Sequence, residues 1–235
     1  MPSYHTAKVI SNELIGPKIR HLKIETSEQI KFEAGQFVMM RLRDDQGEFV
    51  ERAYSIANYT ESGPVEFVVR ITPDGKMSQL IDDLRPLTQA DIKGPFGKFG
   101  LNAITAGPDK IVLIAAGVGI APMRSIIQRS FQRRDSFPIQ LFYGFRANKE
   151  FLFQQEFEKY KSSGRFSLIS AISEPGENNE GSHKGYITGC LQGNIFLPDE
   201  KTQCFICGPP EMVKDCREKL YSLGFDRTQV HVEAW

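Results

Sequence analysis

The segment from Arg52 to Asn58 carries a cation, an aromatic ring and a hydroxyl in close succession. We expect a strand that ends at a binding surface, with Arg52 and Tyr54 on one face and Ala53 and Ser55 on the other. The planar guanidinium of Arg52 suits an anion, Tyr54 suits a flat ring, and Ser55 suits the edge of that ring. One extended ligand with a phosphate and a planar head would use these residues together. A half-buried edge strand with a solvated Arg and a core Tyr is the alternative.

A second candidate ligand-binding segment runs from Thr72 to Ile81. Its Thr-Pro-Asp-Gly start is typical of a turn, and a short helix is expected after Gly75. Backbone N–H groups at a helix start attract anions, Gly75 would let a phosphate approach closely, and Ser78 would add a hydroxyl. An ordinary strand-to-helix turn is the alternative when this segment is considered alone.

A glycine-rich turn in the second half has the pattern Gly117-x-Gly119-x-x-Pro122. It follows the apolar run 110–116, which is typical of a parallel strand covered on both faces. Two glycines and a helix start can bring backbone N–H groups to a pyrophosphate, and Pro122 can begin a helix without losing a donor. Pro122 replaces the third glycine of the common dinucleotide fingerprint, and no acidic residue clearly closes the next strand, at 139–144.

The elements around these segments fall into two groups. Short β-branched and aromatic runs between turns predict a small antiparallel Greek-key β-barrel in the first half. These runs are 8–11, 22–25, 36–40, 52–58 and 65–71, and Gly94-Pro95-Phe96-Gly97 is predicted to be a rigid closing turn. In the second half, strands alternate with helices, which predicts a Rossmann-like parallel sheet. Its expected strands are 110–116, 139–144, 166–171, 204–208 and 230–233, and its helices are 123–131, 150–160 and 209–223.

Composition and charge narrow the class of protein. The chain has 235 residues, of which 40% are hydrophobic and 25% charged, and 29 basic and 29 acidic residues give a formal net charge of +0. This predicts one large domain or two modest ones, with no overall field that attracts nucleic acid. The lack of a long apolar run and of an N-terminal signal predicts a cytoplasmic protein with no membrane span.

The cysteines are too few and too clustered for a disulfide scaffold. They are Cys190, Cys204, Cys207 and Cys216. Cys204 and Cys207 lie three apart on a predicted strand and should point to opposite faces, which disfavours a shared metal ion. No metal site and no iron–sulfur cluster is predicted.

The order of the motifs resembles the ferredoxin–NAD(P)+ reductase family, and the resemblance covers almost the whole chain. The motifs are Arg52-x-Tyr54-Ser55, Gly75-x-x-Ser78, Gly117-x-Gly119-x-x-Pro122, Cys207-Gly208-Pro209-Pro210 and Glu233-x-Trp235. The resemblance implies an FAD-binding barrel at residues 1–103 and an NAD(P)-binding α/β domain at residues 104–235. It also implies an oxidoreductase that transfers hydride between NAD(P)H and FAD, and single electrons to a ferredoxin- or flavodoxin-like carrier.

On the flavin side, the resemblance implies that Arg52 grips the FAD pyrophosphate, Tyr54 packs against the flavin and Ser55 hydrogen-bonds near flavin N5. Trp235 would cover the outer flavin face as a gate that nicotinamide displaces. The full set of implied cofactor-binding residues is Arg52, Ala53, Tyr54, Ser55, Val69, Gly75, Lys76, Met77, Ser78, Gly117, Gly119, Pro122, Arg146, Cys207, Gly208 and Trp235.

On the nicotinamide side, the resemblance places Cys207 and Gly208 beside the nicotinamide and Glu233 near the site of hydride transfer. The implied catalytic residues are Ser55, Cys207, Glu233 and Trp235. Val118 stands where the family usually has Thr, so one hydroxyl contact to the dinucleotide is lost.

Coenzyme preference stays open, with a slight lean to NADH or dual use. Arg146 and Lys149 follow the second parallel strand and would suit a 2′-phosphate. Glu174 follows the third strand, where family members that use NADPH often have Arg, and would repel a phosphate if it points inward.

Two other charged features have alternative interpretations. Arg124, Arg129, Arg133 and Arg134 would dock an acidic carrier or, more simply, form a solvated helix face. His231 would act as a general base or, more simply, pack or face solvent.

The acceptor also has alternatives. Cytochrome b5, an oxygenase component or free flavin would be reduced by the same flavin core. A non-catalytic flavin-binding regulatory subunit is the alternative of another class.

Overall fold

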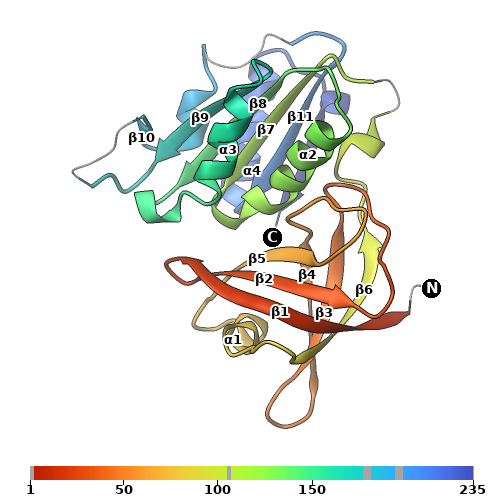
Figure 1. Ribbon diagram of the computed structural model, residues 1–235. Coiled ribbons are helices and arrows are strands. Elements are labelled where there is room, and N and C mark those ends of the chain that lie inside the picture. The colour runs from red at the N-terminus through yellow and green to blue at the C-terminus, as the bar shows by residue number, and fades with distance from the viewer. Residues whose placement is uncertain (1–2, 105–106, 177–180, 194–197, 235) are drawn as a thin grey trace.

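A computed structural model describes residues 3–104, 107–176, 181–193 and 198–234. They form two units, a β-barrel and a helix-flanked parallel sheet, stacked on one another in Figure 1. The predicted fold class, an antiparallel Greek-key barrel followed by a Rossmann-like sheet, is confirmed.

The barrel consists of six antiparallel strands in the order β4-β3-β6-β1-β2-β5. Their bounds are β1 Tyr4–Gly16, β2 Ile19–Thr26, β3 Phe37–Arg43, β4 Phe49–Ser55, β5 Val65–Arg70 and β6 Gln89–Phe96. The two end strands, β4 and β5, also contact each other, so the sheet curls on itself and shields its edges. Helix α1 (Lys76–Asp82) lies at one end of the barrel, between β5 and β6 in the chain (Figure 1).

The second unit is a six-stranded parallel sheet in the order β10-β9-β8-β7-β11-β12. Its strands are β7 Lys110–Ala116, β8 Ile139–Phe145, β9 Phe166–Ile172, β10 His183–Lys184, β11 Thr202–Gly208 and β12 Val230–Ala234. Its helices are α2 Ile120–Gln132, α3 Gln154–Lys161 and α4 Pro210–Ser222. Helices α2 and α3 cover one face and α4 the other (Figure 1), which buries both faces as expected for parallel strands.

Short 3₁₀ turns connect several of these elements. They are η1 Leu101–Ala103, η2 Gly117–Gly119, η3 Asn148–Glu150, η4 Ile187–Cys190 and η5 Arg227–Gln229.

Some predicted bounds are wrong for identifiable reasons. The helix predicted at 150–160 starts at Gln154, because Phe153 has a left-handed backbone (φ 56°) and a 3₁₀ turn precedes it. The turn predicted at 94–97 overlaps β6, which continues to Phe96 while its pairing with β3 shifts register. Helix α2 begins at Ile120 rather than Met123, and the two-residue strand β10 was not predicted.

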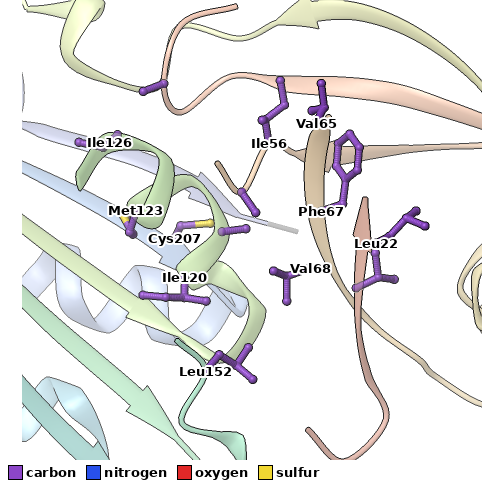
Figure 2. Packing of buried hydrophobic residues seen from close by; sticks show 14 of the residues in the cluster. Leu22, Ile56, Val65, Phe67, Val68, Ile120, Met123, Ile126, Leu152 and Cys207 are labelled. Carbon is purple, nitrogen blue, oxygen red and sulfur yellow. The ribbon is translucent and has the colours of Figure 1, made fainter. Parts of the chain in front are cut away.

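One hydrophobic cluster runs through both units. Strand β5 buries Val65, Phe67 and Val69 in the barrel, while Val68 on its other face points toward α2 (Figure 2). Ile120 and Leu152 of the second unit lie next to Val68 in that view. We call the whole contact between the barrel and the second unit the seam. Burial of apolar side chains there holds the two units together.

Candidate active site

The seam brings together Ser55, the last residue of β4, and Glu233 on β12. The Ser55 hydroxyl donates to Glu233 Oε2 at 3.1 Å, although the residues are 178 positions apart. Burial raises the pKa of the Glu233 carboxyl above its usual range, and the hydrogen bond from Ser55 partly offsets that rise. The pair therefore places, at the meeting point of the two units, a carboxyl that keeps its proton to higher pH than an exposed one.

Strand β4 presents the other residues of the predicted flavin-binding segment. Arg52 is exposed and donates through Nη1 to the Glu51 carbonyl oxygen at 2.7 Å. Tyr54 packs partly against the core, and burial raises the pKa of its phenol to about 12, despite the nearby Arg52 charge. Ala53 is exposed on the same face as Ser55. The donor set along this strand, an exposed cation, a neutral ring and a hydroxyl, fits an FAD with its pyrophosphate, ring and ring edge.

The residues predicted at the start of α1 have mixed orientations. Ser78 is buried, accepts from the Thr72 amide at 3.1 Å and donates to the Gly75 carbonyl oxygen at 2.8 Å. Its hydroxyl hydrogen is therefore used within the turn and is not offered to a phosphate. A Cβ on Gly75 would lie 2.2 Å from Thr72 Oγ1. The turn is therefore packed too tightly for a side chain at this position, which accounts for the glycine.

The side chains of three further residues predicted to bind FAD have contacts within the protein. Lys76 forms an ion pair with Asp44 (Nζ to Oδ2, 2.5 Å). Met77 and Val69 are buried in the core, so only their backbone groups can face a cofactor.

The two glycines of the nucleotide-type turn have different physical roles. Gly117 has a left-handed backbone (φ 55°), and Tyr143 donates to its carbonyl oxygen at 3.0 Å. A Cβ on Gly119 would lie 2.3 Å from the Cys207 carbonyl oxygen, so this glycine allows the turn to pack against the end of β11. Pro122 is buried in the first turn of α2. Close packing accounts for the glycine at position 119, and the contact of both glycine amides with a pyrophosphate stays a prediction.

A cavity of about 470 Å³ opens at the carboxyl ends of the parallel strands, where open α/β sheets bind ligands. Gly117 and Gly144 line it and leave backbone accessible. Arg70 and Arg146 line it too, each in an ion pair with a glutamate, and their guanidinium groups are donors suited to phosphates. Volume, position and donor set fit a nicotinamide dinucleotide.

Arg146 is exposed at the end of β8 and pairs with Glu174 after β9 (Nε to Oε1, 3.1 Å). Glu174 therefore pairs with the cation that the sequence predicts as a partner for a 2′-phosphate. The backbone reinforces this pairing, since the Glu174 amide donates to the Arg146 carbonyl oxygen at 2.8 Å.

The residues predicted to lie beside the nicotinamide differ in burial. Cys207 is fully buried and lies near Ile120 and Met123 in Figure 2, although its backbone pairs with Glu233 in the β11–β12 ladder. Gly208 is buried at the end of β11. Trp235 lies outside the described residues.

The structure shows the surroundings of Cys204, Cys207 and His231. Cys204 and Cys207 belong to hydrophobic clusters on opposite faces of the sheet, as predicted. Among residues 3–104, 107–176, 181–193 and 198–234, no group of three or more His, Cys, Asp or Glu side chains could hold a metal ion. His231 stacks on Phe205 at 4.7 Å between ring centroids and contacts Gln203, which confirms the packed interpretation.

The arginine cluster is not a uniformly solvated face. Arg124 is 8% exposed and forms ion pairs with Glu66 of the barrel and Glu156 of α3. The predicted solvated face is therefore wrong for Arg124, because this side chain is enclosed between the two units. Arg133 and Arg134 are exposed, as predicted.

Sequence reasoning missed several residues around the cavity. Arg70, at the end of β5, forms an ion pair with the buried Glu150 of the second unit (Nη2 to Oε2, 2.8 Å). Tyr186 lines the cavity with its side chain 78% exposed. The alternation of Glu66, Val68 and Arg70 with the apolar residues of β5 was a usable signal that a second surface covers that strand.

Comparison with known proteins decides the family. A family model described as Oxidoreductase FAD-binding domain matches residues 6–100, and one described as Oxidoreductase NAD-binding domain matches residues 113–218. The chain is 30% identical to the reductase component 2 of terephthalate 1,2-dioxygenase from Comamonas sp., over 98% of this chain and 68% of that protein. The chain belongs to the ferredoxin–NAD(P)+ reductase family. It is an FAD-dependent oxidoreductase, and FAD and a nicotinamide dinucleotide are its cofactors.

Other comparisons place the reductase among diverse relatives. It is 32% identical to a component of the Na(+)-translocating NADH-quinone reductase from Klebsiella pneumoniae, over 89% of this chain and 54% of that protein. It superimposes with a TM-score of 0.86 on a ferredoxin NADP+ reductase from Neisseria gonorrhoeae with bound FAD and NADP, at 24% identity and 98% coverage of both chains. No helix in the described parts of the reductase is long and apolar enough to cross a membrane.

Proposed function

We propose that this reductase takes reducing equivalents from NADH and delivers them to a separate one-electron carrier protein, such as a ferredoxin, a flavodoxin or the iron–sulfur component of an oxygenase. When bound, FAD supplies the chemistry that links a two-electron hydride donor to a one-electron acceptor. The observation that carries the proposal is the Ser55–Glu233 hydrogen bond of 3.1 Å across the seam. It places a hydroxyl from the flavin-binding strand and a carboxyl from the nucleotide-binding sheet at one point.

The proposed roles of individual residues follow from their positions. Arg52 holds the FAD pyrophosphate, and Tyr54 supports the flavin ring. Ser55 contacts the reacting edge of the ring, and the hydrogen bond from its hydroxyl to Glu233 fixes its orientation. Cys207 supports the nicotinamide position from beneath, because its side chain is buried. Trp235 would shield the flavin ring until the nicotinamide displaces it.

The remaining proposed contacts and the domain boundary complete this assignment. The backbone around Val69, Gly75, Lys76 and Met77 would border the FAD phosphates. Gly117, Gly208 and Arg146 would border the dinucleotide. We place the boundary between an FAD-binding domain and an NAD-binding domain after residue 103.

NADH is the proposed coenzyme because Glu174 neutralises Arg146 at the cavity rim. A 2′-phosphate would have to displace this carboxylate and would meet its negative charge. NADH brings a ribose hydroxyl there instead, and this hydroxyl can donate a hydrogen bond to the carboxylate.

A basic face on the barrel supports an acidic protein partner. We define it by Arg41, Arg43 and Lys93 on the outer side of β3 and β6, together with Phe49 of β4. Arg43 lies over the Phe49 ring at 3.9 Å, and Phe49 is 43% exposed. Arg43 and Phe49 pair at one end of the β3–β4 ladder, and Ser55 pairs with Phe37 at the other end. Arg41 is paired with Asp91 (Nη2 to Oδ2, 2.8 Å), so Arg43 and Lys93 carry the local positive charge, which favours an acidic partner surface.

The proposal is tested by kinetics with several acceptors and one charge reversal. Arg43→Glu should lower kcat/KM for an acidic ferredoxin about tenfold and weaken the salt dependence, while NADH-driven reduction of ferricyanide stays unchanged. Lys159→Glu, at an exposed cation on α3, is the matched control. Equal rates with a ferredoxin, a flavodoxin and free flavin, none affected by Arg43→Glu, would contradict a protein carrier that docks on this face.

A further inference from the structure

Helix α2 directs a stripe of polar side chains at one short barrel segment, residues 57–59. Ser125 Oγ donates to the Asn58 carbonyl oxygen at 2.7 Å. Gln128 Oε1 accepts from the Tyr59 amide at 2.8 Å. Gln132 Nε2 donates to the Tyr59 carbonyl oxygen at 3.0 Å. These side chains follow one another at helical spacing and bind backbone groups of consecutive residues.

Arg124 adds a charged contact to the same segment. Its Nη1 donates to the Ala57 carbonyl oxygen at 3.0 Å and to Glu66 Oε2 at 2.6 Å, and its Nε donates to Glu156 Oε2 at 2.7 Å. Its guanidinium also lies over the Phe153 ring at 4.3 Å. A buried guanidinium with two carboxylates and a carbonyl around it has a narrowly defined position, because displacing it would leave buried charges unpaired.

The clamped segment and helix α2 each come directly after a part of the active site. Residues 57–59 come directly after Ser55 and Ile56, at the end of the flavin-binding strand β4. Helix α2 comes directly after the Gly117–Gly119 turn beside the dinucleotide cavity. The four polar side chains thus join the backbone that follows the flavin contact to the helix that follows the dinucleotide contact.

The apolar part of the seam cannot do this alone. Packing of Val68 against Ile120 and Leu152 favours contact but tolerates small sliding, because it has no directional requirement (Figure 2). Hydrogen bonds to backbone groups require donor and acceptor at defined distances and angles.

We propose that Arg124, Ser125, Gln128 and Gln132 form a clamp that sets the distance between the two cofactor-binding segments, and that they are positioning residues for hydride transfer. The inference rests on the proposed function. Binding of the dinucleotide depends on the cavity, which the clamp does not line. Loss of the clamp therefore affects the transfer step more than dinucleotide affinity, since transfer is sensitive to displacements of about 1 Å.

The same helix offers a matched control. Ser125 and Ser130 are both serines of α2 with 0% exposure. Ser125 binds the barrel, whereas Ser130 accepts from Arg165 within the second unit (Nη1 to Oγ, 3.4 Å). Ser125→Ala and Ser130→Ala remove the same group from the same helix, and only the first removes a clamp contact.

The test is anaerobic stopped-flow reduction of the FAD-loaded enzyme by NADH, with Tm measured on the same samples. Ser125→Ala and Gln128→Ala should lower the limiting rate of flavin reduction about tenfold and leave the Kd for NADH within about twofold. Ser130→Ala should lower Tm about as much as Ser125→Ala and leave the limiting rate unchanged.

Two outcomes would overturn the inference. In the first, Ser125→Ala lowers Tm but reduces flavin at the wild-type rate, which would make the clamp only structural. In the second, Ser125→Ala and Ser130→Ala slow reduction equally, which would make the effect one of general helix stability. Failure of the wild-type enzyme to be reduced by NADH at all would instead contradict the proposed function.

Discussion

Ser55 and Glu233 are the two predicted catalytic side chains that meet directly. Replacing Ser55 with Ala removes the hydrogen bond that partly lowers the raised pKa of Glu233, so that pKa should rise further. We expect flavin reduction by NADH to slow at least tenfold and its pH dependence to shift toward higher pH. Stopped-flow reduction across the pH range measures both quantities.

A control at the surface separates this effect from general damage. Ser162→Ala, at an exposed serine after α3, should change neither rate nor pH dependence. A Ser55→Ala enzyme whose pH profile overlays that of the wild type would show that the serine does not act through Glu233.

Glu174 determines coenzyme preference in this account. Glu174→Gln removes the negative charge that now pairs with Arg146 and frees the guanidinium for a 2′-phosphate. The ratio of kcat/KM for NADPH to that for NADH should increase about tenfold, and Arg146→Gln in the same chain should abolish the gain. An unchanged ratio in Glu174→Gln would place the 2′ position elsewhere.

Among single residues, the family resemblance placed Ser55 and Glu233 at the same site, but their hydrogen bond to each other was not predicted. The resemblance was not sufficient to orient Ser78, whose hydroxyl is used inside its own turn. It also missed Arg70 and Glu150, because each has its partner in the other unit, and the pattern of β5 can indicate a covered surface but not the residue that covers it.

At the scale of elements, the Gly119 turn is constrained by β11. A Cβ there would lie 2.3 Å from the Cys207 carbonyl oxygen, a backbone atom that cannot turn aside. Gly119→Ala should lower the free energy of unfolding by about 2–3 kcal/mol, as measured by urea denaturation. Gly189→Ala, where nothing lies within 4 Å of the added Cβ, should have little effect. Equal stability of the two variants would mean that β11 can move away from the turn.

Strand and helix positions followed well from periodicity where packing is simple. The predicted run 110–116 coincides with β7, because a strand buried on both faces is continuously apolar. The start of α3 and the course of β6 were not predictable, since they depend on a left-handed Phe153 and on a register shift between β6 and β3. Both features result from tertiary packing that local propensity does not report.

At the scale of the whole molecule, the buried charges at the seam make stability depend on pH. Burial would raise the pKa of Glu66, but hydrogen bonds from His21 and Arg124 lower it from 4.5 to about 2. Because the pKa in the folded state is the lower one, this stabilisation is present above about pH 4.5 and is lost as the pH falls toward about 2. Its full size is at most about 3 kcal/mol.

Urea unfolding at about pH 6 and about pH 3.5 measures this contribution. The wild type should lose more stability over that interval than Glu66→Gln, whose neutral side chain cannot be protonated. Glu158→Gln, at an exposed carboxylate of α3, should retain the wild-type pH dependence. If the Glu66→Gln and wild-type values change in parallel, Glu66 is not the group that links the seam to pH.

The central claim is that the two units together form one site where hydride passes from NADH to FAD. Anaerobic mixing of the FAD-loaded protein with NADH or NADPH tests it most directly. We expect rapid loss of the visible absorbance of oxidised flavin, faster and at lower nucleotide concentration with NADH than with NADPH. A protein that binds no FAD, or whose flavin stays oxidised with both nucleotides, would contradict it.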